Sequence, residues 1–492
     1  MKRASGILMP VFSLPSPYGI GTFGKAAYDW VDFLADAKQT YWQVLPLGPT
    51  SYGDSPYQSF SAFAGNPYFI DPDLLVAAGL LTTQECVAAA CGNDNKVDYA
   101  ALYETRFALL QQAFARFTDD TALDAFWHRH KSWLDDYALY TAIKAANGQR
   151  SWAEWPDDVR LRQPKALEKA RRTLLREQRF CVFLQYLFFT QWDALKTYAE
   201  GKGVRIIGDM PIYVAMDSAD VWANSGIFQL DENNLPTEVS GCPPDGFSAD
   251  GQLWGNPLYR WDMLAQNGYD WWMRRLAASF ELFDTVRIDH FRGLESYYAI
   301  PYGAPNARNG RWREGPGLDF IRVIQKQFRG RQIIAEDLGF LTPGVRQLLR
   351  RSGYPGMKVL QFAFDTREES DYLPHNYQKN CVVYTGTHDN DTMLGWLQTA
   401  RRSDVRFARR YLDIHHRADE QWAFIRAAMA SVADLAVIPM QDYLGLGSEA
   451  RINTPSTLGG NWVWRMAPGG ASETLAARIA GLCSLFGRAP KP

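Results

Sequence analysis

The chain has 492 residues, of which 52 are basic and 54 are acidic, so its formal net charge is −2 and its pI is about 6.4. This balance excludes the strongly basic surface that binding to nucleic acid or to an anionic membrane requires. Six cysteines are too few for a disulfide scaffold in a chain of this length, and no apolar run approaches the roughly 18 residues of a membrane-spanning helix. Pro10 interrupts the apolar run near the N-terminus, which also lacks a signal-peptide cleavage site. We therefore expect a soluble, cytoplasmic protein.

Short apolar runs that end in Gly, Pro, Asp or Glu predict eight strands. Their nearly continuous Val, Ile and Leu content is typical of parallel strands covered on both faces. The spacing between later runs fits one strand and one helix, because 28 residues separate Glu336 from Phe364 and 25 separate Phe364 from Asp389. We therefore predict an α/β fold, a (β/α)8 TIM barrel of the usual ~250 residues enlarged by inserted helical and loop subdomains. In chain order the predicted strands lie in residues 41–49, 68–72, 204–214, 285–290, 332–339, 357–364, 381–389 and 435–446.

Two insertions with different compositions divide the predicted barrel. Residues 81–195 are rich in Ala, Leu, Lys, Arg and Trp at helical spacing, which predicts an all-helical subdomain. Residues 215–283 include a stretch thick with Gly, Pro, Asp and Asn, which predicts a loop insert. The predicted regions are thus 1–80 with the first barrel strands, 81–195 as the helical insert, and 196–492 with the remaining strands.

Two motifs resemble ligand sites but have simpler interpretations. The segment GIGTFG, residues 19–24, fits the G-x-G-x-x-G pattern, yet Pro15 and Pro17 stand where a nucleotide-binding motif needs a strand. We interpret these glycines as a turn into a helix. His128 and His130 are two residues apart, so they do not face each other on a helix, and no H-E-x-x-H or paired-cysteine motif accompanies them. The sequence thus predicts neither a cofactor nor a metal site.

Carboxylates stand at the ends of several predicted strands. Asp289 lies in VRIDHF, Glu336 in IIAEDLG and Asp389 in GTHDND, and an earlier strand supplies Asp209. The active site of a (β/α)8 barrel lies at the C-terminal ends of its strands. A single terminal acid is often only a helix N-cap. Three on nearby strands, beside Arg287 and His388, indicate a shared pocket.

Paired carboxylates are the groups that glycoside chemistry uses. One of them, ionised, attacks the anomeric carbon, while the other, protonated, gives its proton to the leaving oxygen. Arg287, two residues before Asp289, should hold Asp289 ionised through its charge and a hydrogen bond. Glu336 needs a setting such as neighbouring carboxylate charge to stay protonated near neutral pH. This pattern favours Asp289 as nucleophile and Glu336 as proton donor.

Longer segments resemble a known family. VRIDHF, IIAEDLG and THDN are similar to the catalytic segments of the α-amylase clan. The segments SPYQSFSAFAGNPYFID (55–71), GDMPIYVAMDSADVW (208–222) and PPDGFSADGQLWGNPLYRW (243–261) are more specific. They resemble the 4-α-glucanotransferases of glycoside hydrolase family 77, also called amylomaltases or disproportionating enzymes. The resemblance extends from LPSPYGIGTFG to RINTPSTLGGNWVWR, which is essentially the whole chain.

The resemblance implies roles for individual residues. Asp289 would be the nucleophile, Glu336 the acid and base, and Asp389 the group that binds ring hydroxyls of the −1 sugar. In many amylases Asn and His end the segment that matches DMPIYV, near a structural calcium site. Tyr213 and Val214 stand there in this chain, which argues against that calcium site. The substrate-binding positions that the resemblance implies are Arg287, His388, Asp209, Tyr57, Asp245 and Trp254.

The implied reaction is the retaining transfer of an α-1,4-glucan segment from a maltooligosaccharide to the 4-hydroxyl of another glucan, glucose or maltose, without a cofactor. Loops within residues 1–80 would bind the glucan. The first alternative is a hydrolase of the same clan, since both share the glycosyl-enzyme and differ in which acceptor attacks it; the segment 243–261 favours transfer. The second alternative is a non-catalytic glucan-binding protein, which would not need the intact acids Asp289, Glu336 and Asp389.

Overall fold

The computed structural model describes residues 2–51, 53–91, 95–244, 249–339 and 341–490. Its largest sheet has eight parallel strands in the order β10-β11-β12-β1-β2-β3-β6-β9. The strands of this sheet are β1 (Ala4–Leu8), β2 (Tyr41–Gln43), β3 (Arg205–Met210), β6 (Thr285–Ile288), β9 (Gln332–Ala335), β10 (Gly356–Val359), β11 (Cys381–Tyr384) and β12 (Leu435–Pro439).

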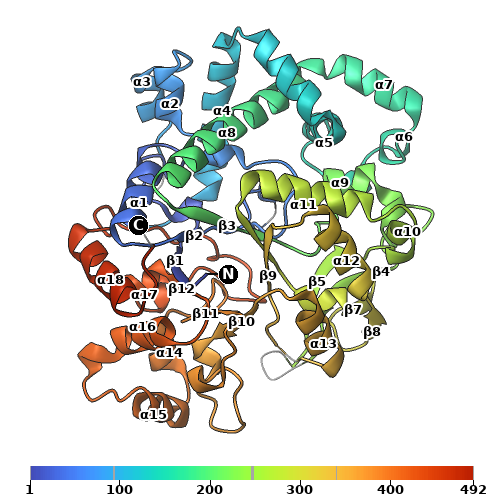
Figure 1. The fold of residues 1–492 in the computed structure, drawn as a ribbon. Helices are drawn as coiled ribbons and strands as arrows, with labels where there is room; N and C mark the ends of the chain where they lie inside the picture. The colour runs from blue at the N-terminus through green and yellow to red at the C-terminus, as the bar shows by residue number, and fades with distance from the viewer. Residues whose placement is uncertain (1, 52, 92–94, 245–248, 340, 491–492) are drawn as a thin grey trace.

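The sheet closes into a barrel between β9 and β10 (Figure 1). The Ala335 amide donates to the Pro355 carbonyl at 2.9 Å, and the Met357 amide donates to Oδ1 of Asp337 at 2.6 Å. Closure gives every strand two neighbours and removes the free sheet edges. The predicted (β/α)8 barrel is confirmed.

One predicted strand is wrong. Residues 68–72 form no strand, although their apolar pattern favours one. The side chain of Asn66 instead caps a 3-10 turn at Pro67–Phe69, and the side chain of Asp71 caps helix α2 (Pro72–Ala77). Both elements begin with proline, which is pre-organised for the first helical position. These local signals outweigh the short apolar run.

The strand that completes the barrel is β1, which the sequence pattern does not single out. Its residues ASGIL include Ala, Ser and Gly, which have low strand propensity. β1 is fixed by pairing on both sides, with Ala4 opposite Leu435 and Gly6 opposite Tyr41. A Cβ at Gly6 would lie 2.7 Å from the Cβ and carbonyl oxygen of Tyr41, so only glycine fits there. Each of the other seven predicted runs contains a barrel strand.

Helices between the strands cover the outside of the barrel (Figure 1). Helix α1 (Lys25–Asp36) shows how they pack: Ala27, Trp30, Val31 and Leu34 are buried and follow the i, i+3, i+4, i+7 spacing of one helix face. The other helices around the barrel are α11 (Asp270–Leu282), α12 (Gly317–Gln327), α13 (Pro343–Ser352), α14 (Met393–Thr399), α15 (Arg402–Tyr411), α16 (Glu420–Ala430), α17 (Met440–Leu444) and α18 (Glu473–Leu485).

A group of helices lies between β2 and β3 in the chain, on one side of the barrel (Figure 1). Its last helix, α8, continues past residue 195 and leads directly into β3, so that no break in the chain marks the end of the insert. The residue boundaries of the three predicted regions therefore stay a prediction. The helices of this group are α3 (Thr83–Ala88), α4 (Tyr99–Arg116), α5 (Asp120–Ala146), α6 (Asp157–Arg160), α7 (Pro164–Thr173) and α8 (Leu175–Gly201).

A second, antiparallel sheet lies beside the barrel, with strand order β5-β4-β7-β8 (Figure 1). The composition of residues 215–283 predicts loops, but the structure has strands β4 and β5 there, and β7 and β8 complete the sheet from beyond β6. Gly and Pro within these strands explain why they were missed. The strands are β4 (Glu238–Cys242), β5 (Gln252–Pro257), β7 (Ser296–Pro301) and β8 (Arg311–Glu314); the region also has α9 (Ala219–Ala223) and α10 (Trp261–Gln266).

Within the described parts of the chain, no helix is both long and apolar enough to cross a membrane.

Short 3-10 turns connect several of these elements. The remaining 3-10 turns are Val11–Ser13, Trp152–Glu154, Ser225–Ile227, Phe291–Leu294, Leu360–Phe362, Pro374–Asn376, Arg417–Asp419 and Ser448–Ala450.

Candidate active site

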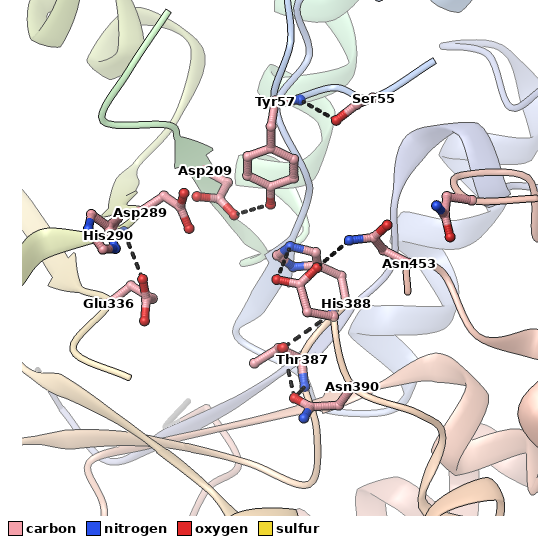
Figure 2. A network of polar contacts seen from close by, with 12 residues as sticks. Ser55, Tyr57, Asp209, Asp289, His290, Glu336, Thr387, His388, Asn390 and Asn453 are labelled. Carbon is pink, nitrogen blue, oxygen red and sulfur yellow. Dashed lines mark hydrogen bonds and ion pairs between the residues drawn. The ribbon is translucent and has the colours of Figure 1, made fainter. Parts of the chain in front are cut away.

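Asp289 and Glu336 lie one residue beyond the ends of two neighbouring barrel strands, β6 and β9. The Asp289 amide donates to the Met210 carbonyl at 3.0 Å, and the Glu336 amide donates to the Ile288 carbonyl at 3.0 Å. The hydrogen-bonded ladder of the barrel therefore continues through both residues. The C-terminal ends of the strands meet at one rim, and both carboxyl groups lie there (Figure 2).

Arg287 is buried on β6 and binds two carboxylates. Its Nη1 donates to both oxygens of Asp209 at 2.6 Å and to Oδ1 of Asp289 at 3.0 Å. The Asp209 side chain is fully buried, whereas that of Asp289 is 27% exposed. The sequence pattern pairs Arg287 with Asp289 alone. The register of β3 and β6 places Asp209 directly opposite Arg287 and so gives the guanidinium a closer partner.

Burial dominates the protonation of the two carboxyl groups at the rim. It raises the pKa of Asp289 well above its usual range; Arg287 lowers that pKa, and the Asp209 and Glu336 carboxylates raise it further. We expected Arg287 to hold Asp289 ionised: the arginine does act in that direction, but burial outweighs it. Burial likewise raises the pKa of Glu336. Since ionising both would place like charges together, the pair retains a proton to higher pH than an isolated acid.

Backbone amides hold the Glu336 carboxyl group on both of its oxygens. The His290 amide donates to Oε2 at 2.7 Å, and the Leu338 amide donates to Oε1 at 2.8 Å. His290 has a φ of 50°, in the left-handed region that residues other than glycine rarely adopt. Strained conformations of this kind are concentrated at functional sites. His290 was not predicted, because its role depends on the conformation of its backbone and not on its residue type.

The imidazole of His290 faces an aromatic side chain of the second sheet. Burial lowers the pKa of His290 to about 3, so the ring is neutral at physiological pH. Its ring centroid lies 4.8 Å from that of Trp254, with the planes at 88°. Trp254 lies on β5, and through this contact it packs on the residue whose backbone amide holds Glu336. Its role in substrate binding stays a prediction. Asp245, the other predicted residue of this segment, lies outside the described residues.

His388 lies beside Tyr57 (Figure 2), and Asp389 directly follows it in the chain. His388 Nε2 lies 3.3 Å from Oδ2 of Asp389. The Tyr57 ring stacks on His388 with centroids 5.1 Å apart and planes at 17°, and its hydroxyl donates to Oδ2 of Asp209 at 2.8 Å. Burial lowers the pKa of His388, against the effect of Asp389. A chain of contacts through the His388 imidazole and the Tyr57 phenol thus connects Asp389 to Asp209.

A segment near the C-terminal end of the chain supports Asp389. Asn453 Nδ2 donates to Oδ1 of Asp389 at 2.6 Å, and its backbone amide donates to the His388 carbonyl at 3.1 Å. Arg451 donates to the Asp389 carbonyl at 2.7 Å and to the Asn453 carbonyl at 2.7 Å. The sequence analysis did not single out Asn453 or Arg451. Both lie in the segment RINTPSTLGGNWVWR, but an Asn and an Arg carry no specific signal without their partners.

Backbone carbonyl groups of the segment after β3 accept hydrogen bonds from side chains of the protein. Arg275 donates to the carbonyls of Pro211 and Ile212, and Asn256 donates to the carbonyl of Val214 at 2.9 Å. Among the described residues, no group of three or more His, Cys, Asp and Glu side chains could hold a metal ion. Oxygen atoms that already accept hydrogen bonds from buried donors are poor candidates for cation ligands.

The glycine segment 19–24 and His130, which resembled parts of ligand sites in the sequence, have structural roles. Gly24 is the N-cap of α1, as expected for a turn into a helix. His130 packs among aromatic side chains, with its ring stacked on Phe189 at 5.4 Å and against Phe126 at 4.5 Å.

Comparison with known proteins identifies the family. The family model described as 4-alpha-glucanotransferase matches residues 9–471. The 4-alpha-glucanotransferase of Clostridium butyricum is 47% identical over 486 residues, which cover 98% of this chain and 100% of the relative. That of Thermus thermophilus is 51% identical over 492 residues, covering 97% of this chain and 98% of the relative.

A solved structure matches over the same length. The amylomaltase from Streptococcus agalactiae in complex with acarbose has a TM-score of 0.97 at 39% identity, and the match covers 99% of this chain and 100% of that one. With the matching family model, the close relatives and this structure, the chain belongs to the 4-α-glucanotransferase family, glycoside hydrolase family 77.

Proposed function

We propose that this 4-α-glucanotransferase moves α-1,4-glucan segments between maltooligosaccharides by two successive displacements at Asp289. The observation that carries this proposal is the placement of two carboxyl groups at adjacent strand ends in different settings. Asp289 contacts the Arg287 guanidinium, whereas Glu336 is held by two backbone amides. A retaining mechanism needs one ionised and one protonated carboxyl group, so the surroundings of the two groups must differ.

In the first displacement a carboxylate oxygen of Asp289 attacks the anomeric carbon of the donor. The glycosidic bond breaks as the proton of Glu336 passes to the leaving 4-oxygen, and the reducing-end segment departs. This step requires Asp289 to be the ionised member of the pair, and Arg287, whose Nη1 donates to it, favours that state against the effect of burial. The remaining segment is then bound covalently to Asp289.

In the second displacement the 4-hydroxyl of an acceptor sugar gives its proton to Glu336. The hydroxyl oxygen attacks the anomeric carbon, and the bond to Asp289 breaks. Both carboxyl groups return to their first protonation states, and the anomeric configuration is retained because it has been inverted twice.

The surrounding polar groups bind the sugar whose bond is broken. Asp389, held by Asn453 and His388, accepts hydrogen bonds from ring hydroxyls. Hydrogen bonds to these hydroxyls that strengthen in the transition state contribute several kcal/mol in glycosidases. Tyr57, stacked on His388, offers an aromatic face to the same sugar. Asp209 and Arg287 are buried below the rim, where they hold Tyr57 and Asp289 in position.

The substrates follow from the family and the site. The Streptococcus agalactiae amylomaltase was solved with acarbose, and we expect the same class of ligand to enter this site. Donors are α-1,4-glucans and maltooligosaccharides, acceptors include glucose and maltose, and loops within residues 1–80 line the path. The reaction belongs to starch and glycogen metabolism. We place the protein in the cytoplasm, in keeping with six cysteines that are all free.

Incubation with maltotriose alone tests this function. We expect glucose and longer α-1,4-glucans with little net gain of reducing ends, because each transfer breaks one glycosidic bond and forms another. Trp254→Ala and Asp245→Ala should lower transfer more than hydrolysis. Release of glucose in step with new reducing ends by the unmodified protein would identify a hydrolase instead.

A further inference from the structure

Strand β5 is irregular where it carries Trp254. It lies at the edge of the second sheet, and among the described residues β4 is the one strand that pairs with it. The two strands pair at Leu253 and again at Pro257, but the register shifts between these positions. Gly255, with a φ of 78°, lies within this interruption. An interrupted ladder leaves residues without regular pairing, so other contacts must fix the position of Trp254.

The side chain of Asn256 supplies contacts of this kind. It is 5% exposed and uses both ends of its amide group. Nδ2 donates to the Val214 carbonyl at 2.9 Å and to Gln58 Oε1 at 3.3 Å. Oδ1 accepts from Ser240 Oγ at 3.3 Å and from Gln58 Nε2 at 3.4 Å. One amide therefore joins β5 to β4, to the segment after β3 and to the loop before α2.

Two of the segments that Asn256 joins contain residues next to Tyr57 and to a ring that contacts Trp254. Gln58 directly follows Tyr57, and its Nε2 also reaches the Trp254 carbonyl at 3.5 Å. Val214 directly follows Tyr213, whose ring centroid lies 6.3 Å from that of Trp254. Asn256 thus ties the backbone around Trp254 to the barrel rim on both sides.

The position of Trp254 matters for Glu336 because His290 lies between them. The Trp254 ring packs edge-on against the His290 ring, and the His290 amide donates to Glu336. Glu336 is the group that activates the acceptor in the proposed second displacement. The Trp254 ring packs on the residue whose amide holds this group, and from that position we expect it to carry the incoming sugar.

We propose that Asn256 is a positioning residue that holds Trp254 on the acceptor side of Glu336 and thereby favours a sugar over water as acceptor. This inference rests on the proposed function. A sugar acceptor gains its advantage over water at about 55 M from being held in place, and well-oriented groups reach effective concentrations of roughly 10⁵ M or more. Water, in contrast, can attack without being held by an aromatic ring. Loosening Trp254 should therefore lower transfer and leave hydrolysis unchanged.

Asn256→Leu tests the proposal, because it removes all four hydrogen bonds and nearly keeps the volume of the side chain. With maltotriose as donor and labelled glucose as acceptor, we expect the KM for glucose to rise about five- to tenfold, the effect of losing a net hydrogen bond or two. The KM for the donor and the kcat of hydrolysis should stay within about twofold. Combining Asn256→Leu with Trp254→Ala should add nothing to Trp254→Ala alone, since both act through one ring.

Gln229→Leu is the matched control. Gln229 Nε2 donates to the Tyr259 carbonyl at 3.0 Å and to the Tyr297 hydroxyl at 3.1 Å, within the same inserted region but without contact to Trp254. It should lower the melting temperature without changing the share of hydrolysis. Gln58→Leu, which removes only part of the Asn256 contacts, provides the same test with a smaller expected change if Asn256→Leu does not fold.

Two results would overturn the proposal in distinguishable ways. If the Asn256 variants lose melting temperature as Gln229→Leu does but keep the acceptor KM and the share of hydrolysis, Asn256 is only structural. If the unmodified protein itself gains reducing ends in step with glucose, the proposed transfer function fails, whatever the variants do.

Discussion

Arg287 and Asp209 form a buried pair in which one guanidinium nitrogen donates to both carboxylate oxygens at 2.6 Å. The same nitrogen reaches Asp289 at 3.0 Å, and the Tyr57 hydroxyl donates to Asp209. The charge of Arg287 is therefore shared between a fully buried carboxylate and one that is 27% exposed. Asp209 fixes the guanidinium in position, so that Asp289 can contact it and still remain accessible at the rim.

Removing one member of this pair should destabilise the protein strongly. Arg287→Met leaves the Asp209 carboxylate buried without its cation, a change that typically costs about 3–5 kcal/mol. The double variant Arg287→Met with Asp209→Asn should recover part of that loss, because no isolated charge remains. Denaturant unfolding of the two single variants and the double variant measures this. A double variant that is destabilised by the sum of the two single effects would contradict the coupling.

The proposed nucleophile is tested by Asp289→Ala. This change removes the atom that forms the covalent bond, so we expect transfer from maltotriose to fall by a factor of at least about 10³ while the fold is kept. In the unmodified protein the first product should keep the α configuration, which NMR of early reaction mixtures shows. The carboxyl groups of Asp289 and Glu336 should be separated by about 5–5.5 Å, as in retaining enzymes. Inverted products, or near-normal turnover by the variant, would rule out double displacement.

The proton donor should set the alkaline limit of activity. Burial raises the pKa of Glu336, so the protonated acid persists above the ordinary carboxyl range and is lost as pH rises through that raised pKa. The pH dependence of kcat/KM should be bell-shaped, with its alkaline limb absent in Glu336→Gln. That variant should lose about 10²- to 10⁴-fold in kcat on unactivated maltooligosaccharides. Full activity of the variant would show that another group donates the proton.

Activity should not depend on a bound metal ion. The carbonyls of Pro211 and Ile212 accept hydrogen bonds from the buried Arg275. We therefore expect exhaustive treatment with a chelator to change neither the activity nor the melting temperature by more than the experimental error. Arg275→Met, in contrast, should lower the melting temperature, because it removes the Arg275 donor from the Pro211 carbonyl and one of two donors, Arg275 and the Tyr259 hydroxyl, from the Ile212 carbonyl. A loss of activity on chelation that calcium restores would contradict the prediction.

Arg488, near the C-terminal end of the sequence, should be essential for stability. Its side chain is fully buried and donates to the carbonyls of Ala4 and Met429 at 2.7 Å, which ties the C-terminal segment to β1. We expect Arg488→Met to cost at least about 2 kcal/mol, the typical effect of losing hydrogen bonds from a charged donor and leaving buried acceptors unpaired. Arg426→Met, at an exposed arginine that lies over Phe486, is the control and should change stability little. Equal effects of the two variants on denaturant unfolding would contradict this role.

The sequence alone determined seven of the eight barrel strands and the positions of Asp289 and Glu336 at the rim, because each depends on a local pattern. A buried parallel strand is a continuous apolar run, and a side chain at its end lies at the rim whatever the rest of the chain does. The run IIAE therefore places Glu336 correctly without reference to any other residue. Where local chemistry offered a competing signal, as with the caps of Asn66 and Asp71 around residues 68–72, the apolar pattern misled.

Only the tertiary structure decided which groups meet. Asp209 is the closer partner of Arg287 because β3 and β6 pair in one particular register, although the two residues are 78 positions apart. Asn453 reaches Asp389 across 64 positions, and β1 becomes a strand through neighbours on both sides despite its low propensity. The pKa values of Asp289 and Glu336 are also decided here, since burial depends on every segment that covers the rim. Contacts between distant segments depend on the packing of the whole chain, and no local pattern of residues contains them.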